Sequence, residues 1–230
     1  MRIVAAMIVG PGEGVRYLDR TLRLASVWAD EIVACCDRCD QDTLDAVRAR
    51  TPHLCLVGEK GFHESTVRNS LFAMLDDTID DGDIVVILDA DEELRRLDGG
   101  PPRQVLKSFV SDHGADAWAV KFWHLWSPDG TVHRVDGAWQ PSVGCRIYRH
   151  RKAGRVPERE IASAAIPSPP NDFAPPQLGI AHWGYARPHD RQAKHEHYMA
   201  VDGGRFHLLS HLESIITEAT ETTLEPVPCS

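Results

Sequence analysis

An acidic cluster directly follows a short apolar run. The run Ile84–Leu88 is entirely apolar, and Asp89, Asp91, Glu92 and Glu93 lie within the next five positions. Their mutual repulsion is costly unless a cation or solvent neutralises them. Because alternate residues of an extended segment point the same way, Asp89 and Asp91 are placed to share one Mg²⁺ or Mn²⁺, which in turn binds a diphosphate. The alternative is a solvated acidic helix start, since glutamate favours a first helical turn.

Three further polar features are candidates for ligand contacts. The loop Gly10–Gly14 lets the backbone approach a ligand closely, because glycine has no side chain. Asp37 is placed to accept from a base N–H, or else is a turn residue. Arg68 lies on the polar side of an expected helix and meets a phosphate or the acidic cluster, or else is a surface charge. The sequence has no phosphate-binding loop that ends in Lys-Ser or Lys-Thr.

Strand and helix signals alternate over residues 1–95. Buried strands are expected at Arg2–Val9, Glu31–Cys36, Leu54–Val57 and Ile84–Leu88, and helices at Arg16–Trp28, from Asp42 or Thr43 to Ala49, and at Glu64–Leu75. Strands separated by helices form parallel βαβ units, so this half predicts a Rossmann-like nucleotide-binding sheet. Ligands of such sheets bind at the carboxyl ends of the strands, and this rule points to Gly10–Gly14, Asp37–Asp42, Gly58–His63 and Asp89–Glu93.

The second half has a different pattern. Strands of a mixed or antiparallel region are expected at Ala117–Trp126, Val143–Tyr148 and Ile180–Trp183, an irregular proline-rich segment at 157–176, and closing helices at His189–Val201 and Phe206–Ala219. We therefore expect a single domain over residues 1–220. Its nucleotide-binding half is 1–95, its acceptor and metal half is 96–200, and 221–230 form a flexible tail.

Composition limits the class of protein. The 230 residues are 43% hydrophobic and 26% charged, which excludes wholesale disorder. With 25 basic and 34 acidic side chains the formal charge is −9, so no general nucleic-acid binding is expected. No run approaches the ~18 apolar residues of a membrane span, and the first apolar run is too short for a signal peptide, so a cytoplasmic protein is expected. Cys36-x-x-Cys39 is interpreted as free thiols, with a redox pair or a zinc site as alternatives.

The order of these features resembles a family 2 glycosyltransferase of the GT-A fold. The resemblance rests on Glu13 in the first loop, Asp37, Arg68-Asn69 and Leu88-Asp89-Ala90-Asp91-Glu92-Glu93. It continues through Arg134–Trp139, Cys145–Arg149 and His182-Trp183-Gly184-Tyr185, with Lys194 and Tyr198 beyond, and covers most of residues 2–200. It implies an α/β fold with a mixed, mostly parallel sheet flanked by helices and a C-terminal helical segment.

The same resemblance implies an activity and a site. The reaction would move a sugar from a nucleotide-sugar, most often a UDP-sugar, to a hydroxyl of a glycan, lipid-linked or protein acceptor, with inversion and with Mn²⁺ or Mg²⁺ as cofactor. In the implied site, Gly10, Pro11 and Glu13 line the nucleoside pocket, Asp37 meets the uracil, Arg68 lies near the base or the phosphates, Asp89-Ala90-Asp91 contact the ribose and the metal, and His182 is a further metal ligand or a diphosphate contact.

The catalytic base is less clearly marked. A carboxylate must deprotonate the acceptor hydroxyl, and the resemblance places it near Pro157, which stands where the family has a histidine. Glu158 is the favoured base, with Glu160 and Asp136 as alternatives. Two other functions stay open. One is a nucleotidyltransferase acting on a sugar phosphate, and the other is a catalytically degenerate protein that binds a nucleotide or a glycan.

Overall fold

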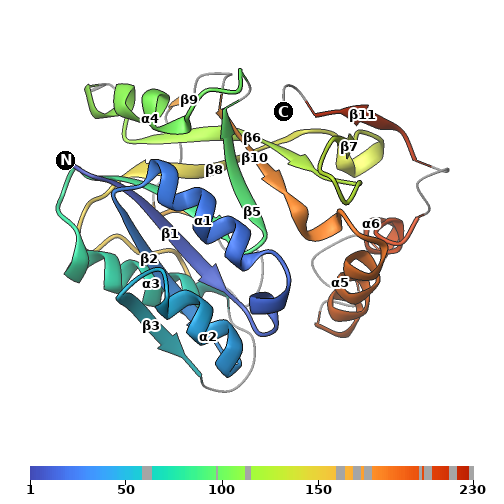
Figure 1. Ribbon diagram of the computed structural model, residues 1–230, viewed down its shortest axis with the longest axis horizontal. Coiled ribbons are helices and arrows are strands. Elements are labelled where there is room, and N and C mark those ends of the chain that lie inside the picture. The colour runs from blue at the N-terminus through green and yellow to red at the C-terminus, as the bar shows by residue number, and fades with distance from the viewer. Residues whose placement is uncertain are drawn as a thin grey trace.

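The computed structural model describes residues 1–58, 64–96, 98–111, 115–158, 164–167, 172–173, 178–201, 204, 209–217 and 222–227. Within them the chain forms a nine-stranded mixed sheet flanked by helices (Figure 1). The predicted fold class, a mixed and mostly parallel α/β sheet with a C-terminal helical segment, is confirmed. No described helix combines the length and the apolar character that crossing a bilayer requires.

The first half follows the predicted alternation closely. Its elements are β1 (Ile3–Val9), α1 (Leu18–Trp28), β2 (Glu31–Asp37), α2 (Gln41–Arg48), β3 (His53–Val57), α3 (Glu64–Thr78) and β4 (Ile84–Asp89), with a short 3-10 helix at Glu13–Val15. Boundaries shift by up to three residues, and one predicted helix cap differs. The N-cap of α2 is Asp40, not Asp42 or Thr43, because the Asp40 carboxylate accepts from the backbone N–H of Thr43.

The second half supplies the rest of the sheet and the closing helices. Its elements are β5 (Glu92–Arg96), α4 (Pro102–Ser111), β6 (Ala117–His124), β7 (Val132–Arg134), β8 (Ser142–Arg149), β9 (Asp172–Phe173), β10 (Leu178–His182), α5 (Pro188–Val201), α6 (Leu209–Ser214) and β11 (Leu224–Pro226). The strand order is β3-β2-β1-β4-β8-β6-β10-β5, and β9 pairs with β6.

The strand directions decide which residues share one edge of the sheet. β1 is parallel to β2 and β4, β8 is antiparallel to β4 and β6, and β10 is parallel to β6. The carboxyl ends of β1, β2, β4, β6 and β10 therefore lie at the same edge. β5 runs the opposite way and pairs Glu92 with His182, so its first residue also lies there.

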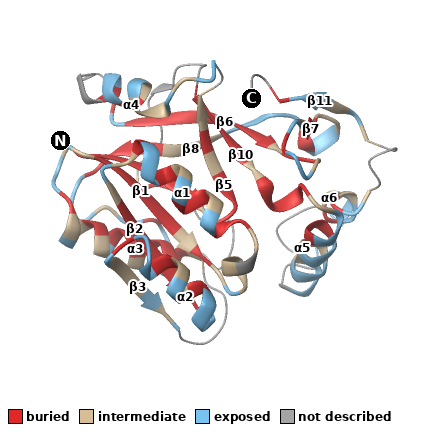
Figure 2. Ribbon diagram, in the orientation of Figure 1, coloured by how far each residue is buried: buried red, intermediate tan, exposed pale blue. Residues whose placement is uncertain are grey.

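Apolar side chains cover both faces of the sheet. On one face Ile3, Ala5 and Met7 pack with residues of α1, α2 and α4. On the other face Val4 and Ala6 pack with residues of α3. The burial of β1, β2 and β4 on both faces is why they are nearly continuous apolar runs. The buried central strands and the exposed outer surface of α5 are visible in Figure 2.

Two segments differ from the expectation. Glu92 and Glu93 begin strand β5, not a solvated helix, because β5 pairs antiparallel with β10 from Glu92 to Arg96. Residues 224–226, expected in a flexible tail, form β11 and pair with β7. Val227 follows β11 and is buried against Leu125 and Trp183, which anchors this end of the chain.

Candidate functional site

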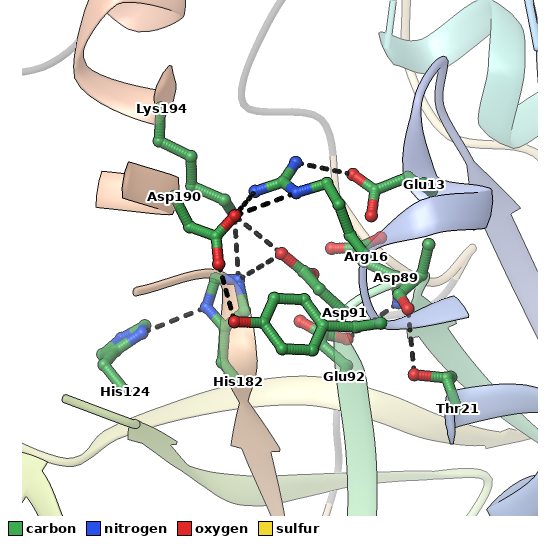
Figure 3. Close-up of polar contacts among 12 residues, drawn as sticks. Glu13, Arg16, Thr21, Asp89, Asp91, Glu92, His124, His182, Asp190 and Lys194 are labelled. Atoms are coloured by element: carbon green, nitrogen blue, oxygen red, sulfur yellow. Dashed lines mark hydrogen bonds and ion pairs between the residues drawn. The ribbon is translucent and has the colours of Figure 1, made fainter. Parts of the chain in front are cut away.

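Polar side chains from four distant parts of the chain meet at the carboxyl edge of the sheet. Figure 3 shows Glu13 and Arg16 from the first loop, Asp89, Asp91 and Glu92 from the β4–β5 turn, His124 and His182 from β6 and β10, and Asp190 and Lys194 from α5. The turn itself is held from both sides. The Thr21 hydroxyl of α1 donates to the carbonyl of Ala90 at 2.9 Å, and the backbone N–H of Trp183 donates to that of Asp91 at 2.8 Å.

Asp91 is buried against two basic side chains. Its Oδ2 atom lies 2.8 Å from Nζ of Lys194 and 3.3 Å from Nε2 of His182. Burial by itself would raise the pKa of Asp91, but the charges of Lys194 and His182 outweigh it and hold this pKa well below its usual range. Asp91 is therefore ionised at neutral pH.

A chain of nitrogen contacts continues from Lys194. Nζ of Lys194 lies 3.1 Å from Nε2 of His182, and Nδ1 of His182 lies 3.1 Å from Nδ1 of His124. Burial, and then the neighbouring His182, lower the pKa of His124 to about 3, so His124 is neutral. Nε2 of His182 therefore faces both the ammonium of Lys194 and the carboxylate of Asp91, and Nδ1 of His182 faces His124.

Asp89 and Glu92 share a different cation. Nη2 of Arg146, in β8, donates to Oδ2 of Asp89 at 3.1 Å and to Oε1 of Glu92 at 2.7 Å. Burial would raise the pKa of Asp89, but Arg146 and then Arg68 lower it. Burial raises the pKa of Glu92 to about 7, against the opposing charge of Arg146. Asp89 is thus ionised, and Glu92 titrates near neutral pH.

The first loop is tied to α5 by a second network. Arg16 lies 3.1 Å from Glu13 and 3.1 Å from Asp190, and the hydroxyl of Tyr17 donates to Asp190 at 2.6 Å. Burial, and then the charge of Asp91, raise the pKa of Glu13 to about 7. Oε2 of Glu13 is buried and has no hydrogen-bond partner among the described residues. Oε2 of Glu13 is therefore free to accept a hydrogen bond from a ligand.

The glycines of the loop have different roles. A Cβ on Gly14 would overlap Thr43 of α2, so this glycine permits close packing between loop and helix. Gly12 has φ 75°, a left-handed conformation that favours glycine, and its N–H donates to Asp40 at 2.7 Å. A Cβ on Gly10 would meet nothing within 4 Å. The same holds for Gly12, and the neighbouring Pro11 is exposed, so this part of the loop has open space beside it.

Asp37 and Arg68 are both buried and both paired. Asp37 accepts from Nη2 of the adjacent Arg38 at 2.8 Å, and Arg38 reaches it with φ 52°, in the left-handed region. Arg68 donates to Glu64 through Nη2 at 2.6 Å. Nη1 of Arg68 is buried without a hydrogen-bond partner among the described residues, as is Nη1 of Arg146. The charges of Arg146 and Arg68 both lower the pKa of Asp89, so these two guanidinium groups lie near that carboxylate.

The predicted bases are placed differently from one another. Glu158 is exposed at the rim of a pocket of about 480 Å³, beside Thr66 and Asn69 of α3. Asp136 accepts from Arg134 at 2.6 and 2.8 Å, and this bond holds the pKa of Asp136 below its usual range, which makes it a weak base. Glu160 lies outside the described residues.

The predicted metal ligands do not fit a divalent ion as they stand. Asp91 and His182 lie together, but the ammonium of Lys194 contacts both of them. Asp89 faces Arg146 instead of Asp91. Among the residues that the structure describes, no group of three or more His, Cys, Asp or Glu side chains is arranged to hold a metal ion. The space between the predicted ligands is taken by a protein cation.

Several members of the site were given no chemical role from the sequence. Arg146 has a recognisable signal, since an arginine inside the apolar strand Ser142–Arg149 needs a carboxylate partner once buried. Asp190 and Lys194 are four apart on α5, so they share one face of that helix. His124 and Arg16 have no comparable signal, because only the tertiary fold brings them to Asp91.

Comparison with known proteins gives a likeness of fold. No protein-family model and no curated protein sequence matches the chain. HddC from Yersinia pseudotuberculosis is 12% identical and aligns over 86% of this chain and 100% of its own, with a TM-score of 0.41. A 4-diphosphocytidyl-2C-methyl-D-erythritol synthase is 22% identical over 65% of this chain and 75% of its own, with a TM-score of 0.38.

A third solved structure has a similar degree of likeness. A CMP:2-keto-3-deoxy-manno-octonic acid synthetase complexed with CTP is 15% identical over 65% of this chain and 74% of its own, with a TM-score of 0.38. Neither the synthase nor the synthetase is named a glycosyltransferase. Likeness at this level supports no conclusion about the reaction. The resemblance to family 2 therefore stays an interpretation of the sequence motifs.

Proposed function

We propose that this chain is a glycosyltransferase that moves a sugar from a nucleoside-diphosphate sugar to an acceptor hydroxyl. One observation carries the proposal. Glu13, Asp91 and Lys194 meet at the carboxyl edge of a mostly parallel sheet, where ligands of such sheets bind. Unsatisfied guanidinium N–H groups of Arg68 and Arg146 lie beside the same acidic turn. Buried cationic donors without partners suit the oxygens of a diphosphate.

The proposed chemistry is a single displacement at the anomeric carbon. The acceptor oxygen forms a bond to this carbon on the face opposite the diphosphate, and the bond from the carbon to the phosphate oxygen breaks. Lys194, Arg68 and Arg146 offset the charge that develops on the leaving diphosphate. A carboxylate takes the acceptor proton, and we assign this role to Glu158. Glu158 lines a pocket with Ser65, Thr66, Asn69 and Ser70, and we propose that the acceptor enters there.

Turnover and binding measurements test the proposal. The chain is incubated with UDP-, GDP- and CDP-sugars, and the free nucleoside diphosphate and sugar are followed by mass spectrometry, since glycosyltransferases slowly hydrolyse donors when no acceptor is present. Release of one diphosphate is expected, with binding of the same diphosphate in a calorimetric titration. Binding without turnover across a panel of sugar acceptors would instead favour a degenerate, binding-only protein.

A matched pair of variants tests the base. Glu158→Gln should keep diphosphate binding and lose donor turnover, because the amide cannot accept the acceptor proton. Asp136→Asn should keep both, since Asp136 is committed to Arg134. Undiminished turnover in Glu158→Gln would move the base to another carboxylate, of which Glu160 is the nearest in sequence.

A nucleotidyltransferase is the second candidate. The observation in its favour is Arg16, a half-buried guanidinium in the glycine-rich loop that follows β1, where a triphosphate-binding loop needs positive charge. Against it, Arg16 is already paired with Glu13 and Asp190. Pyrophosphate release from a nucleoside triphosphate in the presence of sugar 1-phosphates would establish this activity, and its absence alongside donor turnover would exclude it.

A further inference from the structure

Each carboxylate of the acidic cluster has a protein cation as its partner. Lys194 contacts Asp91 at 2.8 Å, and Arg146 contacts Glu92 at 2.7 Å. Arg146 also contacts Asp89 at 3.1 Å, while Glu93 lies 3.1 Å from Arg20 and 3.2 Å from Arg95. From the sequence, the four neighbouring carboxylates were expected to need a metal ion to offset their mutual repulsion. In the folded chain, lysine and arginine side chains supply the cations.

Three contacts fix the position of the Lys194 ammonium. Its ammonium lies between Asp91 and His182, at 2.8 and 3.1 Å, and 4.9 Å from the ring centre of Tyr185. Gly184 keeps the space open, because a Cβ there would overlap both Lys194 and Asp91.

We propose that Lys194 takes the place of the divalent metal in this site, so that nucleoside diphosphate binds without a metal ion. The ammonium stands between the two side chains, Asp91 and His182, that would otherwise be metal ligands. Among the described residues these two contacts account for two of its three N–H groups. The third N–H is available to a diphosphate oxygen. The part of this inference that concerns diphosphate rests on the proposed function, whereas the part that concerns metal does not.

Two measurements on the unaltered chain test the inference. In electron paramagnetic resonance, the free Mn²⁺ signal should be the same with and without the protein, because the ammonium of Lys194 lies between the predicted ligands Asp91 and His182. In a calorimetric titration, the affinity for the diphosphate that binds should be equal in EDTA and in Mn²⁺. Stoichiometric loss of the free Mn²⁺ signal, or loss of affinity in EDTA, would overturn the inference.

A variant pair isolates the lysine. Lys194→Ala should weaken diphosphate binding in EDTA by roughly tenfold to a hundredfold, because a charge-assisted contact is lost and Asp91 is left uncompensated. The freed Asp91 and His182 should then bind Mn²⁺, which the resonance signal detects, and added Mn²⁺ should restore part of the affinity. Lys107→Ala, an exposed lysine of α4, should behave like the unaltered chain in every assay. Unchanged affinity of Lys194→Ala in EDTA would refute the role of Lys194.

The two proposals fail separately. If no nucleoside diphosphate binds, the proposed function is wrong. The Mn²⁺ signals of the unaltered chain and of Lys194→Ala still decide whether the Lys194 ammonium occupies the place of a metal ion. If Lys194→Ala does not fold, the two measurements on the unaltered chain remain sufficient, since Mn²⁺ uptake overturns the inference and equal affinity in EDTA supports it.

Discussion

Arg146 is the residue on which the acidic turn depends most directly. Its side chain is 12% exposed in β8 and pairs with both Asp89 and Glu92. Taking a charged group out of water is costly, and a buried pair tolerates this only while both partners are present. A change at this position should therefore affect the folded state as well as the site.

The first prediction concerns this pair. Arg146→Met should lower the free energy of unfolding by about 3–5 kcal/mol, because Asp89 and Glu92 lose their shared cation in a buried setting. Arg48→Met is the control, since Arg48 forms an exposed pair with Asp45 and should change stability by no more than about 0.5 kcal/mol. Urea denaturation measures both. Equal effects of the two substitutions would contradict the assignment.

The second prediction concerns pH. The pKa of Glu13 is raised to about 7, so the folded chain holds this proton more tightly than the unfolded chain does. The stabilising contribution is complete below the unfolded pKa of roughly 4.5 and is lost as pH rises through about 7, by up to about 3 kcal/mol. Glu13→Gln does not titrate. Its stability relative to the unaltered chain should rise between about pH 5 and pH 8 in parallel urea titrations, and a constant difference would argue against the raised pKa.

At the scale of elements, the first loop and α5 depend on each other. They are more than 170 positions apart, yet Tyr17 and Arg16 both reach Asp190 at the start of α5. The hydroxyl of Tyr17 is committed to this contact in a buried setting. The position of Lys194, one turn further along α5, follows from this attachment.

The third prediction separates this hydroxyl from tyrosine burial in general. Tyr17→Phe should destabilise the chain by about 1–2 kcal/mol, because a hydrogen bond to a charged group is lost and Asp190 loses a buried donor. Tyr148→Phe is the matched control. Its hydroxyl is buried and, among the described residues, has no hydrogen-bond partner, so its removal should be neutral or stabilising. Thermal unfolding compares them, and the reverse order would contradict the network.

For the molecule as a whole, the end of the chain contributes to the core beside the site. β11 pairs with β7, and Val227 is 6% exposed in a cluster with Tyr17, Leu125 and Trp183. Trp183 is the residue that follows His182 and donates its backbone N–H to Asp91. Residues near position 227 therefore support the strand end that carries the site.

The fourth prediction measures this support. Val227→Ala should cost about 1–2 kcal/mol of unfolding free energy, because two buried methyl groups are removed. Val27→Ala, at a valine that is 67% exposed on α1, should be near neutral. Chemical denaturation gives both values. A harmless Val227→Ala would mean that the β7–β11 region is not packed as described.

The sequence by itself determined the βαβ half of the fold and the sheet edge where polar residues gather. This was possible because strands buried on both faces, such as Ile3–Val9 and Ile84–Asp89, are continuous apolar runs. Parallel order then places Glu13, Asp37, Asp89 and Asp91 at one edge without further information. The metal, the base and the transferred group are not fixed by these patterns and stay predictions.

Only the tertiary structure decided which charges neutralise the acidic turn. The sequence shows four carboxylates within five positions. Their partners Arg146 and Lys194 come from β8 and α5, more than 50 and 100 positions away along the chain. The same applies to β11, whose pairing with β7 depends on a neighbour that is distant in sequence. Electrostatic partners are set by distance in space, and the sequence records only distance along the chain.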